Sequence, residues 1–191
     1  MSSALPLLFI DVDGVLNPFD APPGPIPDGF VRHYLRPTTW TDQHPHLLRD
    51  DVPDLSVWLH PDHGEELSDL PFELIWATTW EHEANTYISP RIGLPDLPVV
   101  TFSIAGGIGP EGTYFKTVDI VKAAAGRPFV WLDDQLDEYD RTFVERHHRA
   151  PAWLYDVDPA VGLGLDDFEA LARWTDTHTV PDPPGLVDGG S

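Results

Sequence analysis

Five short runs of uninterrupted apolar residues constrain the fold of this chain more than any other feature. These runs do not alternate polar and apolar residues. Continuous hydrophobicity over five or six residues is typical of strands that are buried on both faces, as in a parallel sheet. The expected strands are Leu5–Ile10, Phe72–Ala77, Leu97–Phe102, Pro128–Leu132 and Ala152–Tyr155.

Helix-like stretches separate or follow these runs. The expected helices are His63–Leu70, Trp80–Ser89, Thr113–Ala125, Leu136–His148 and Asp166–Trp174. Asp166 is a suitable N-cap for the last helix, and Gly126 is a suitable C-terminal stop for the third. Strands that alternate with helices predict a doubly wound α/β fold with right-handed crossovers, in which helices cover both faces of a parallel sheet.

Two segments break this alternation. Residues 17–61 hold nine prolines, five of them between Pro18 and Pro27, which excludes a regular helix there. We expect an ordered loop, hairpin or flap, too short for a large cap domain. The segment 176–191 holds three Pro, three Gly and three Asp, and we expect a flexible tail. The prediction is therefore one domain over residues 1–175, with the insert at 17–61.

Charge and composition exclude several function classes. The 191 residues include 11 Lys+Arg and 32 Asp+Glu, and the net charge of −21 repels nucleic-acid backbones and anionic membranes. The absence of cysteine excludes disulfides, thiolate zinc sites and a Cys nucleophile. No apolar run reaches the roughly 18–20 residues that span a bilayer, and no signal peptide is evident. We expect a soluble cytoplasmic protein that binds neither membranes nor nucleic acid.

An acidic pair follows the first expected strand. Asp11 and Asp13, in the segment Asp11-Val12-Asp13-Gly14, lie at the carboxyl end of a strand, where open α/β sheets bind ligands. Once the chain leaves the strand at Gly14, both carboxylates can face one crevice. A turn with solvated aspartates is the alternative, because Asp and Gly are common turn residues.

Further polar residues occupy equivalent positions along the chain. They are Thr78 and Thr79 after the second strand, Lys116 at the opening of the third helix, and Asp133 and Asp134 after the fourth strand. The only other lysine, Lys122, lies about 9 Å further along that helix and away from the strand ends. Taken singly, Thr78 and Asp134 could be helix caps. The ordered set of acid pair, hydroxyl, lysine and acid pair predicts one polar site.

This ordered set resembles the four motifs of the haloacid dehalogenase superfamily. Those motifs are an apolar strand ending in DxDG, a strand ending in Thr or Ser, a lysine, and a strand ending in two acids. Leu7–Asn17, Leu74–Asn85 and Trp131–Asp134 look especially like a family of uncharacterised bacterial members. The resemblance spans residues 7–140 and implies a Rossmann-like fold with the first strand central in the sheet.

The resemblance also implies a role for each residue. Asp11 would be the nucleophile that accepts a phosphoryl group, and Asp13 would be the general acid for the leaving oxygen and then the base for water. Asp13 also distinguishes phosphotransferases from dehalogenases in the superfamily. Thr78 would hydrogen-bond the phosphate, with Thr79 as the alternative. Lys116 would neutralise phosphate charge and hold Asp11 ionised.

A metal ion follows from both the resemblance and electrostatics. The implied Mg²⁺ ligands are Asp11, the Asp13 carbonyl, Asp133 and Asp134. Several carboxylates in one crevice with only Lys116 to balance them would repel strongly without a divalent cation, and Mg²⁺ prefers such oxygen ligands. Either Asp133 or Asp134 could be the inner ligand, and the acidic motif could extend to Asp137 or Asp140.

The expected function is that of a Mg²⁺-dependent phosphohydrolase or phosphotransferase for a small phosphate monoester, acting through an aspartyl-phosphate. One alternative is a non-catalytic metal-binding regulatory module, as in response-regulator receivers. Those receivers carry the phosphorylated Asp after strand three, whereas no acid ends the run Val99–Phe102 here. Another alternative is an interaction protein that binds a basic partner, for which Asp11→Asn would leave function unchanged.

Overall fold

Four of the five apolar runs form strands of one parallel sheet. The structure is a computed structural model that describes residues 5–24 and 27–178. Its strands are β1 (Leu7–Ile10), β2 (Val31–Leu35), β3 (Leu55–Leu59), β4 (Glu73–Trp76), β5 (Phe129–Asp133) and β6 (Ala152–Asp156). Its α-helices are α1 (Thr38–Thr41), α2 (His63–Asp69), α3 (Glu83–Tyr87), α4 (Ser89–Ile92), α5 (Thr117–Ala124), α6 (Glu138–His147) and α7 (Leu165–His178). Two 3₁₀ turns cover Arg49–Asp51 and Pro110–Gly112.

The parallel sheet has the order β4-β1-β5-β6, so β1 is an interior strand. Ile10, the last residue of β1, pairs with Trp76 of β4 on one side and with Leu132 of β5 on the other. The chain passes from β1 to β4 on one side and then returns to β5 on the opposite side. This reversal places the ligand-binding crevice of an open α/β sheet at the carboxyl end of β1.

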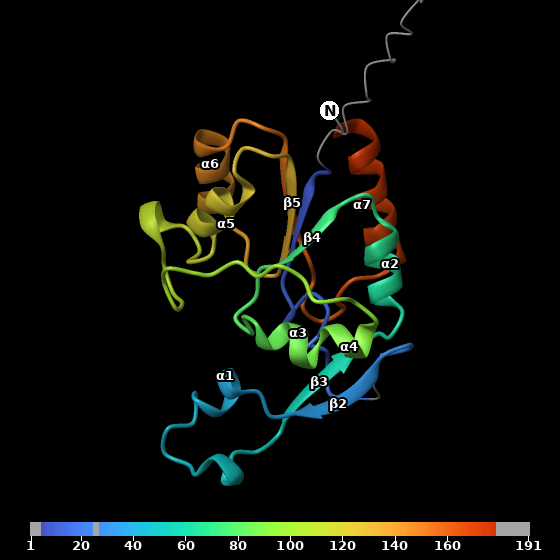
Figure 1. Ribbon diagram of the computed structural model, residues 1–191, viewed down its shortest axis with the longest axis vertical. Helices are drawn as coiled ribbons and strands as arrows, with labels where there is room; N and C mark the ends of the chain where they lie inside the picture. Colours follow the sequence, from blue (N-terminus) through green and yellow to red (C-terminus); the bar gives the residue numbers. More distant parts are fainter. Residues whose placement is uncertain (1–4, 25–26, 179–191) are drawn as a thin grey trace, which may run out of the picture.

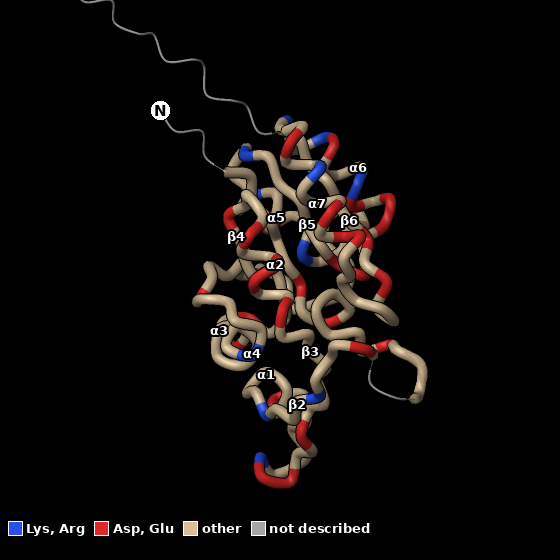
Figure 2. The backbone as a smooth tube through the Cα atoms, turned by 90° about the vertical axis from the view of Figure 1, so that its right-hand side faces the viewer, with Lys and Arg blue, Asp and Glu red and all other residues tan. Residues whose placement is uncertain are grey.

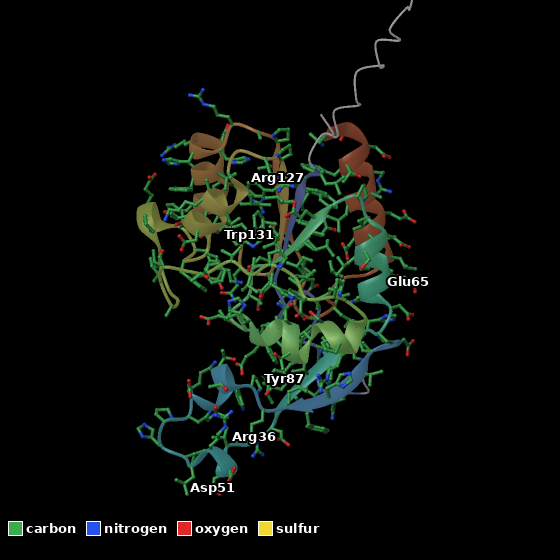
Figure 3. The ribbon with its side chains drawn as sticks, in the orientation of Figure 1. Arg36, Asp51, Glu65, Tyr87, Arg127 and Trp131 are labelled. Atoms are coloured by element: carbon green, nitrogen blue, oxygen red, sulfur yellow. The ribbon has the colours of Figure 1, made fainter. Side chains whose placement is uncertain are left out.

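Helices cover both faces of this sheet, as expected for an α/β fold (Figure 1). Leu8 and Ile10 belong to a core cluster that includes residues of α2 and α7, whereas Leu7 and Phe9 belong to a cluster with residues of α5 and α6. Successive strand residues point to opposite faces, which is why an uninterrupted apolar run is needed here. Trp131 of β5 lies in the interior and is completely buried (Figure 3).

The expected strand at Leu97–Phe102 is wrong. Within this run, only Val99 forms a β-bridge, and its partner is Trp76 of β4. Two hydrogen bonds make this bridge: the Trp76 N–H donates to the Pro98 carbonyl, and the Val100 N–H donates to the Trp76 carbonyl. Pro98 has no N–H to donate, so the run cannot continue a ladder on both sides. Part of the run is buried, as its apolar character indicated, since Val100 is 5% exposed. The run nevertheless does not form a strand.

Several helix boundaries also differ from the expectation. The stretch Trp80–Ser89 begins with turns and gives only the short helices α3 and α4. The third expected helix starts at Thr117, with Lys116 as its N-cap, and ends at Ala124, followed by Ala125 and Gly126, which both have positive φ.

The last helix is longer than expected at both ends. Asp166 lies inside the first turn of α7 and is not its N-cap; the carboxylate of Asp167 accepts the N–H of Gly164 instead. The helix continues to His178, so residues 176–178 are helical, contrary to the expected tail. The remaining part of that expected tail, residues 179–191, lies outside the described residues.

The proline-rich insert contains an antiparallel pair of strands, β2 and β3, with α1 and a 3₁₀ turn between them. We call residues 31–59 the flap; it extends away from the parallel sheet below α3 and α4 (Figure 1). Its buried residues Leu35, Val57 and Leu59 belong to the same core cluster as Ile10, so the flap packs on the body through a continuous apolar layer.

No helix in the described part of the chain is both long enough and apolar enough to cross a membrane.

Candidate active site

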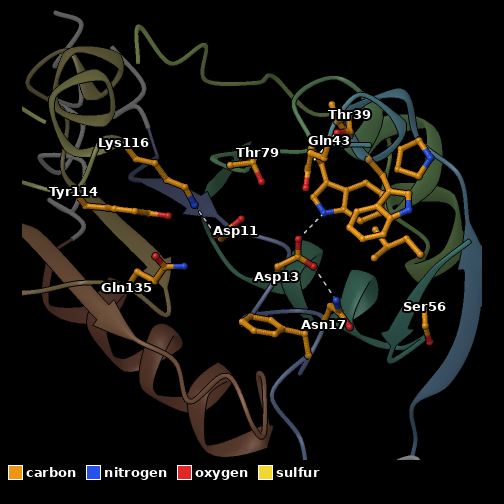
Figure 4. A pocket seen from close by; sticks show the side chains of 15 residues that line it. Asp11, Asp13, Asn17, Thr39, Gln43, Ser56, Thr79, Tyr114, Lys116 and Gln135 are labelled. Atoms are coloured by element: carbon orange, nitrogen blue, oxygen red, sulfur yellow. Dashed lines mark hydrogen bonds and ion pairs between the residues drawn. The ribbon is translucent and has the colours of Figure 1, made fainter. Parts of the chain in front are cut away.

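The carboxyl end of β1 opens into a cavity of about 400 Å³ between the body and the flap (Figure 4). The side chains that line it are Asp11, Asp13, Asn17, Phe19, Pro37, Thr39, Trp40, Gln43, Leu55, Ser56, Thr79, Trp80, Tyr114, Lys116 and Gln135. The cavity therefore contains both aspartates of the first motif and the lysine that the sequence singled out.

Lys116 joins the ends of two neighbouring strands. Its Nζ lies 2.5 Å from Asp11 Oδ2 and 2.8 Å from Asp133 Oδ2, and Lys116 itself has no exposed surface. Because Ile10 and Leu132 are paired in register, Asp11 and Asp133 leave the sheet side by side. Burial lowers the pKa of Lys116, but Asp11 and Asp133 outweigh it and hold that pKa well above its usual value, so the ammonium stays charged.

The other oxygen of Asp11 is also held. Asp11 Oδ1 accepts the N–H of Val12 at 2.7 Å, and the residue is 6% exposed. With Lys116 on Oδ2, the carboxylate is fixed by a cation and by a backbone donor. These two hydrogen bonds, one of them charge-assisted, fix the orientation of the carboxylate.

Asp140 fastens the segment that carries Lys116. Its fully buried carboxylate accepts the Tyr114 N–H at 2.8 Å and the Thr117 hydroxyl at 2.5 Å through Oδ1, and the Asp137 N–H at 3.0 Å through Oδ2. Asp137 in turn caps α6 by accepting the N–H groups of Tyr139 and Asp140. These two residues thus support the loop around Lys116, and the sequence alone left them as possible extensions of the metal motif.

Three carboxylates converge near the lysine. Asp11, Asp133 and Asp134 each offer an oxygen, and these oxygens all lie within 4.8 Å of one another. Within residues 5–24 and 27–178, no other group of three His, Asp or Glu residues gathers in this way. Asp134 Oδ1 is buried and has no hydrogen-bond partner. The site thus contains one buried carboxylate oxygen, Asp134 Oδ1, that accepts no hydrogen bond from the surrounding residues.

Burial affects the protonation of this cluster. It raises the pKa of Asp133 to about 7 and also raises the pKa of Asp134, because a charged carboxylate loses its hydration when it is buried. Repulsion by the neighbouring Asp11 raises both pKa values further. One lysine does not compensate three carboxylates. The donor set, made only of hard oxygens, fits a divalent cation such as Mg²⁺.

Gly14 lets Asp134 approach the first motif. Gly14 has φ +80°, and a Cβ built on it would lie 2.4 Å from Asp134 Cγ. No other residue type offers both the backbone conformation and the space. The glycine of the first motif therefore has a specific role, which is to admit the acid of the fourth motif.

Asp13 lies in the cavity and accepts two side-chain donors. Asn17 Nδ2 donates to Oδ1 at 2.7 Å and Trp80 Nε1 donates to Oδ2 at 2.9 Å (Figure 4). Burial raises the pKa of Asp13 above its ordinary value, and nearby Asp11 adds to this, while the two donors act in the opposite direction. The carboxyl group is thus fixed in orientation beside the nucleophile candidate.

Asn17 connects this carboxyl group to the flap. While its Nδ2 donates to Asp13, its Oδ1 accepts the N–H of Trp58 in β3 at 2.9 Å. The sequence analysis assigned no role to Asn17 or Trp80. Asn17 stands within the first motif, but nothing in the local sequence shows that Trp80 reaches Asp13 from 67 residues away.

The two threonines after β4 occupy different environments. Thr79 is exposed and lines the cavity, whereas Thr78 is completely buried and its hydroxyl lies 3.4 Å from the Trp80 N–H. The structure thus brings Thr79, the alternative candidate, to the cavity wall together with Asp11, Asp13 and Lys116.

No protein-family model, curated protein or solved structure matches this chain, so its function is argued from the geometry of the site.

Proposed function

We propose that this protein is a Mg²⁺-dependent phosphohydrolase of the haloacid dehalogenase type, acting on a phosphate monoester through an aspartyl-phosphate at Asp11. The observation that carries the proposal is the buried Lys116 ammonium, which bridges Asp11 at the end of β1 and Asp133 at the end of β5. Phosphoryl transfer requires positioned charge more than covalent assistance, and this arrangement supplies a nucleophile and a fixed cation.

Asp11, Asp133 and Asp134 would hold the metal ion, together with the backbone carbonyl of Asp13. The unsatisfied Asp134 oxygen and the convergence of the three carboxylates support this assignment. When bound, Mg²⁺ would neutralise negative charge on the phosphoryl oxygens. Asp133 and Asp134 would thus both be ligands in this assignment.

The chain's own residues account for each proton and bond. An Asp11 oxygen attacks phosphorus, a new O–P bond forms, and the bond between phosphorus and the leaving oxygen breaks. Asp13 gives its proton to that leaving oxygen. In the second half, Asp13 takes a proton from water, the water oxygen attacks the phosphoryl group, and Asp11 is released with inorganic phosphate.

Lys116 and a threonine would complete phosphate recognition. Lys116 donates a hydrogen bond to Asp11 Oδ2, and its ammonium lies where negative charge would gather during transfer. The hydroxyl of Thr79 reaches the same cavity and would donate to a phosphoryl oxygen. This assignment prefers Thr79 to Thr78.

A small substrate suits the electrostatics of the surface. Acidic segments are spread over the body, and basic ones are few (Figure 2). A polyanion such as a nucleic acid would be repelled before it reached the cavity, whereas a single phosphate can be bound by the local cation.

Hydrolysis of a generic aryl phosphate tests the proposal. We expect turnover by the wild-type protein with Mg²⁺ and none with EDTA. The Asp11→Asn variant should lose at least about a thousandfold in kcat, because an amide is not a nucleophile here. Asp11→Asn purified in the same way controls for a contaminating phosphatase, and Leu48→Ala, altered at an exposed residue outside the cavity, controls for an unspecific effect of substitution. Equal turnover by the wild type and Asp11→Asn would reject the mechanism.

A further inference from the structure

The part of the cavity wall that the flap provides carries no charge. Its residues are Pro37, Thr39, Trp40, Gln43, Leu55 and Ser56. Lys116 is the only cation among all the lining residues, and it already contacts Asp11 and Asp133. A second phosphate or a carboxylate on the substrate would therefore be buried without a partner, which is costly. The wall selects against a second negative charge.

Aromatic rings from the flap and from the body line the cavity, and the ring from the flap is held in place. In the flap, the Trp40 Nε1 donates to the Pro53 carbonyl at 2.8 Å, and the ring packs edge-on against His44 with centroids 4.5 Å apart. In the body, Phe19 lines the same cavity and is 55% exposed. A large exposed aromatic and a fixed indole that line the same cavity offer apolar surface suited to a flat ring.

The element that carries Trp40 is itself anchored to the body. The Glu83 carboxylate of α3 accepts the N–H groups of Thr38 and Thr39 at 2.6 and 2.7 Å, at the start of α1. Nearby, the Tyr87 hydroxyl donates to the Arg36 carbonyl at 3.3 Å, and Tyr87 lies between the body and the flap (Figure 3). Because α1 is tied down at its first turn, the indole is positioned before a ligand arrives, which limits the entropy lost on binding.

We propose that this cavity, as the leaving-group site of the phosphohydrolase proposed above, selects monophosphates whose leaving group is a planar, uncharged aromatic ring contacted by Trp40 and Phe19. The single cation restricts the substrate to one phosphoryl group, and the neutral flap restricts the remainder to an uncharged ring. That these ligands are substrates rests on the proposed function. The selectivity of binding does not, because it can be measured without turnover.

A matched pair of non-hydrolysable ligands tests the binding selectivity. Benzylphosphonate and cyclohexylmethylphosphonate have the same length and charge and differ only in whether the ring is planar and aromatic. We expect calorimetry with Mg²⁺ to show that the wild type binds benzylphosphonate about three- to tenfold more tightly, as aromatic contacts provide. A carboxylate in the para position of the benzyl ring should abolish detectable binding.

Variants identify the residue responsible. Trp40→Leu should bind the two phosphonates equally, Trp40→Phe should keep most of the preference, and Leu48→Ala on the exposed part of the flap should behave as the wild type. Equal affinity of the wild type for the two ligands, or binding of neither, would overturn the proposal. So would a preference that survives Trp40→Leu and Phe19→Ala combined.

Turnover of the corresponding phosphate esters separates the two proposals. Benzyl phosphate and cyclohexylmethyl phosphate have similarly basic leaving groups, so a difference in kcat/KM reports recognition. Selective phosphonate binding without hydrolysis of either ester would reject the phosphohydrolase and leave the ring selectivity standing. Equal kcat/KM for both esters would leave the phosphohydrolase standing and reject the selectivity.

Discussion

The carboxyl edge of the parallel sheet and the flap face the same cavity but are built differently. Every residue of β1 and β5 is buried, and the charged groups at their ends are held by one another. In the flap, β2 exposes most of its side chains, and a few hydrogen bonds and three buried aliphatic residues attach it to the body. The charged wall of the cavity is thus supplied by fully buried strands, and the uncharged wall by a segment with more exposed side chains.

The largest effect should come from removing the buried cation. Lys116→Met leaves Asp11 and Asp133 buried without a cation, and we expect the free energy of unfolding in EDTA to fall by about 3–5 kcal/mol. Mg²⁺ should restore part of this loss, because it would bind only the folded carboxylate cluster. Urea unfolding with and without Mg²⁺ measures both effects.

The second lysine is the matched control. Lys122 pairs with Asp119, but its side chain is 67% exposed, so Lys122→Met should cost less than about 1 kcal/mol. If the two lysine variants are equally stable, the ion pairs at the sheet edge contribute no more to the free energy of unfolding than an ion pair on the surface does. The sheet edge would then not differ from the surface in this respect.

The junction between flap and body should make stability depend on pH. His63 follows β3, stacks on His60 with centroids 4.8 Å apart, and packs against Phe168. Its Nδ1 is buried without a partner. Burial lowers the pKa of His63 to about 4, and the neighbouring His60 contributes. Between about pH 6.5 and 4, the unfolded chain therefore binds a proton that the folded protein does not.

The stability that the neutral His63 provides is present above about pH 6.5 and is lost as the pH falls towards 4. The loss should reach roughly 3 kcal/mol. His63→Gln should flatten the pH dependence of the unfolding free energy in this window, whereas His46→Gln, at an exposed position, should not. Parallel curves for the wild type and His63→Gln would contradict the assignment.

A glycine pair tests the contact between the first and fourth motifs. Gly14 and Gly93 have nearly the same φ, +80° and +82°, but a Cβ at Gly93 would meet nothing within 4 Å. Both alanine variants should lose about 1 kcal/mol for the left-handed backbone. Gly14→Ala should lose roughly 2 kcal/mol more and bind Mg²⁺ more weakly, since Asp134 must move. Equal Mg²⁺ affinity in the two variants, measured by calorimetry, would mean that Asp134 does not need this contact.

The smallest effect should come from loosening the flap. Glu83→Gln keeps the side-chain shape but weakens its two hydrogen bonds to the start of α1, and should cost at most about 1 kcal/mol of stability. For an aromatic monophosphate, KM should rise severalfold with kcat little changed, whereas KM for the cyclohexylmethyl ester should hardly change. A fall in kcat for both esters would show that Glu83 acts on the chemistry and not on Trp40.

The sequence predicted the parallel sheet well because its strands are buried on both faces. The runs that became β1, β4, β5 and β6 could be recognised without tertiary information. The flap strand Val31–Leu35 could not, because most of its side chains are exposed and it pairs with β3 over a separation of 20 to 28 residues. Proline content predicted neither the short helix α1 within the insert nor the pairing of β2 with β3.

The candidate site shows the same division. Asp11, Lys116 and Asp133 were found because each lies at the end of a strand or the start of a helix, and a parallel sheet gathers those positions at one edge. Trp80 was missed as a site residue, and Asp140 was considered only as a possible extension of the acidic motif, because both act through hydrogen bonds to distant segments. Such contacts depend on the folded geometry and leave no local pattern in the chain.

The most direct test of the central claim is to trap the covalent intermediate. Wild-type protein and radiolabelled monophosphate would be mixed with Mg²⁺ and quenched in acid before the steady state. One half of the sample would be counted for protein-bound label, and the other half would be reduced with borohydride, which releases the phosphate and leaves an alcohol, and mapped by peptide mass spectrometry. We expect a phosphoryl label on the protein before reduction and a reduced side chain at Asp11 after it, both absent in Asp11→Asn. Substrate turnover with no label on the protein, or with the label on another residue, would contradict it.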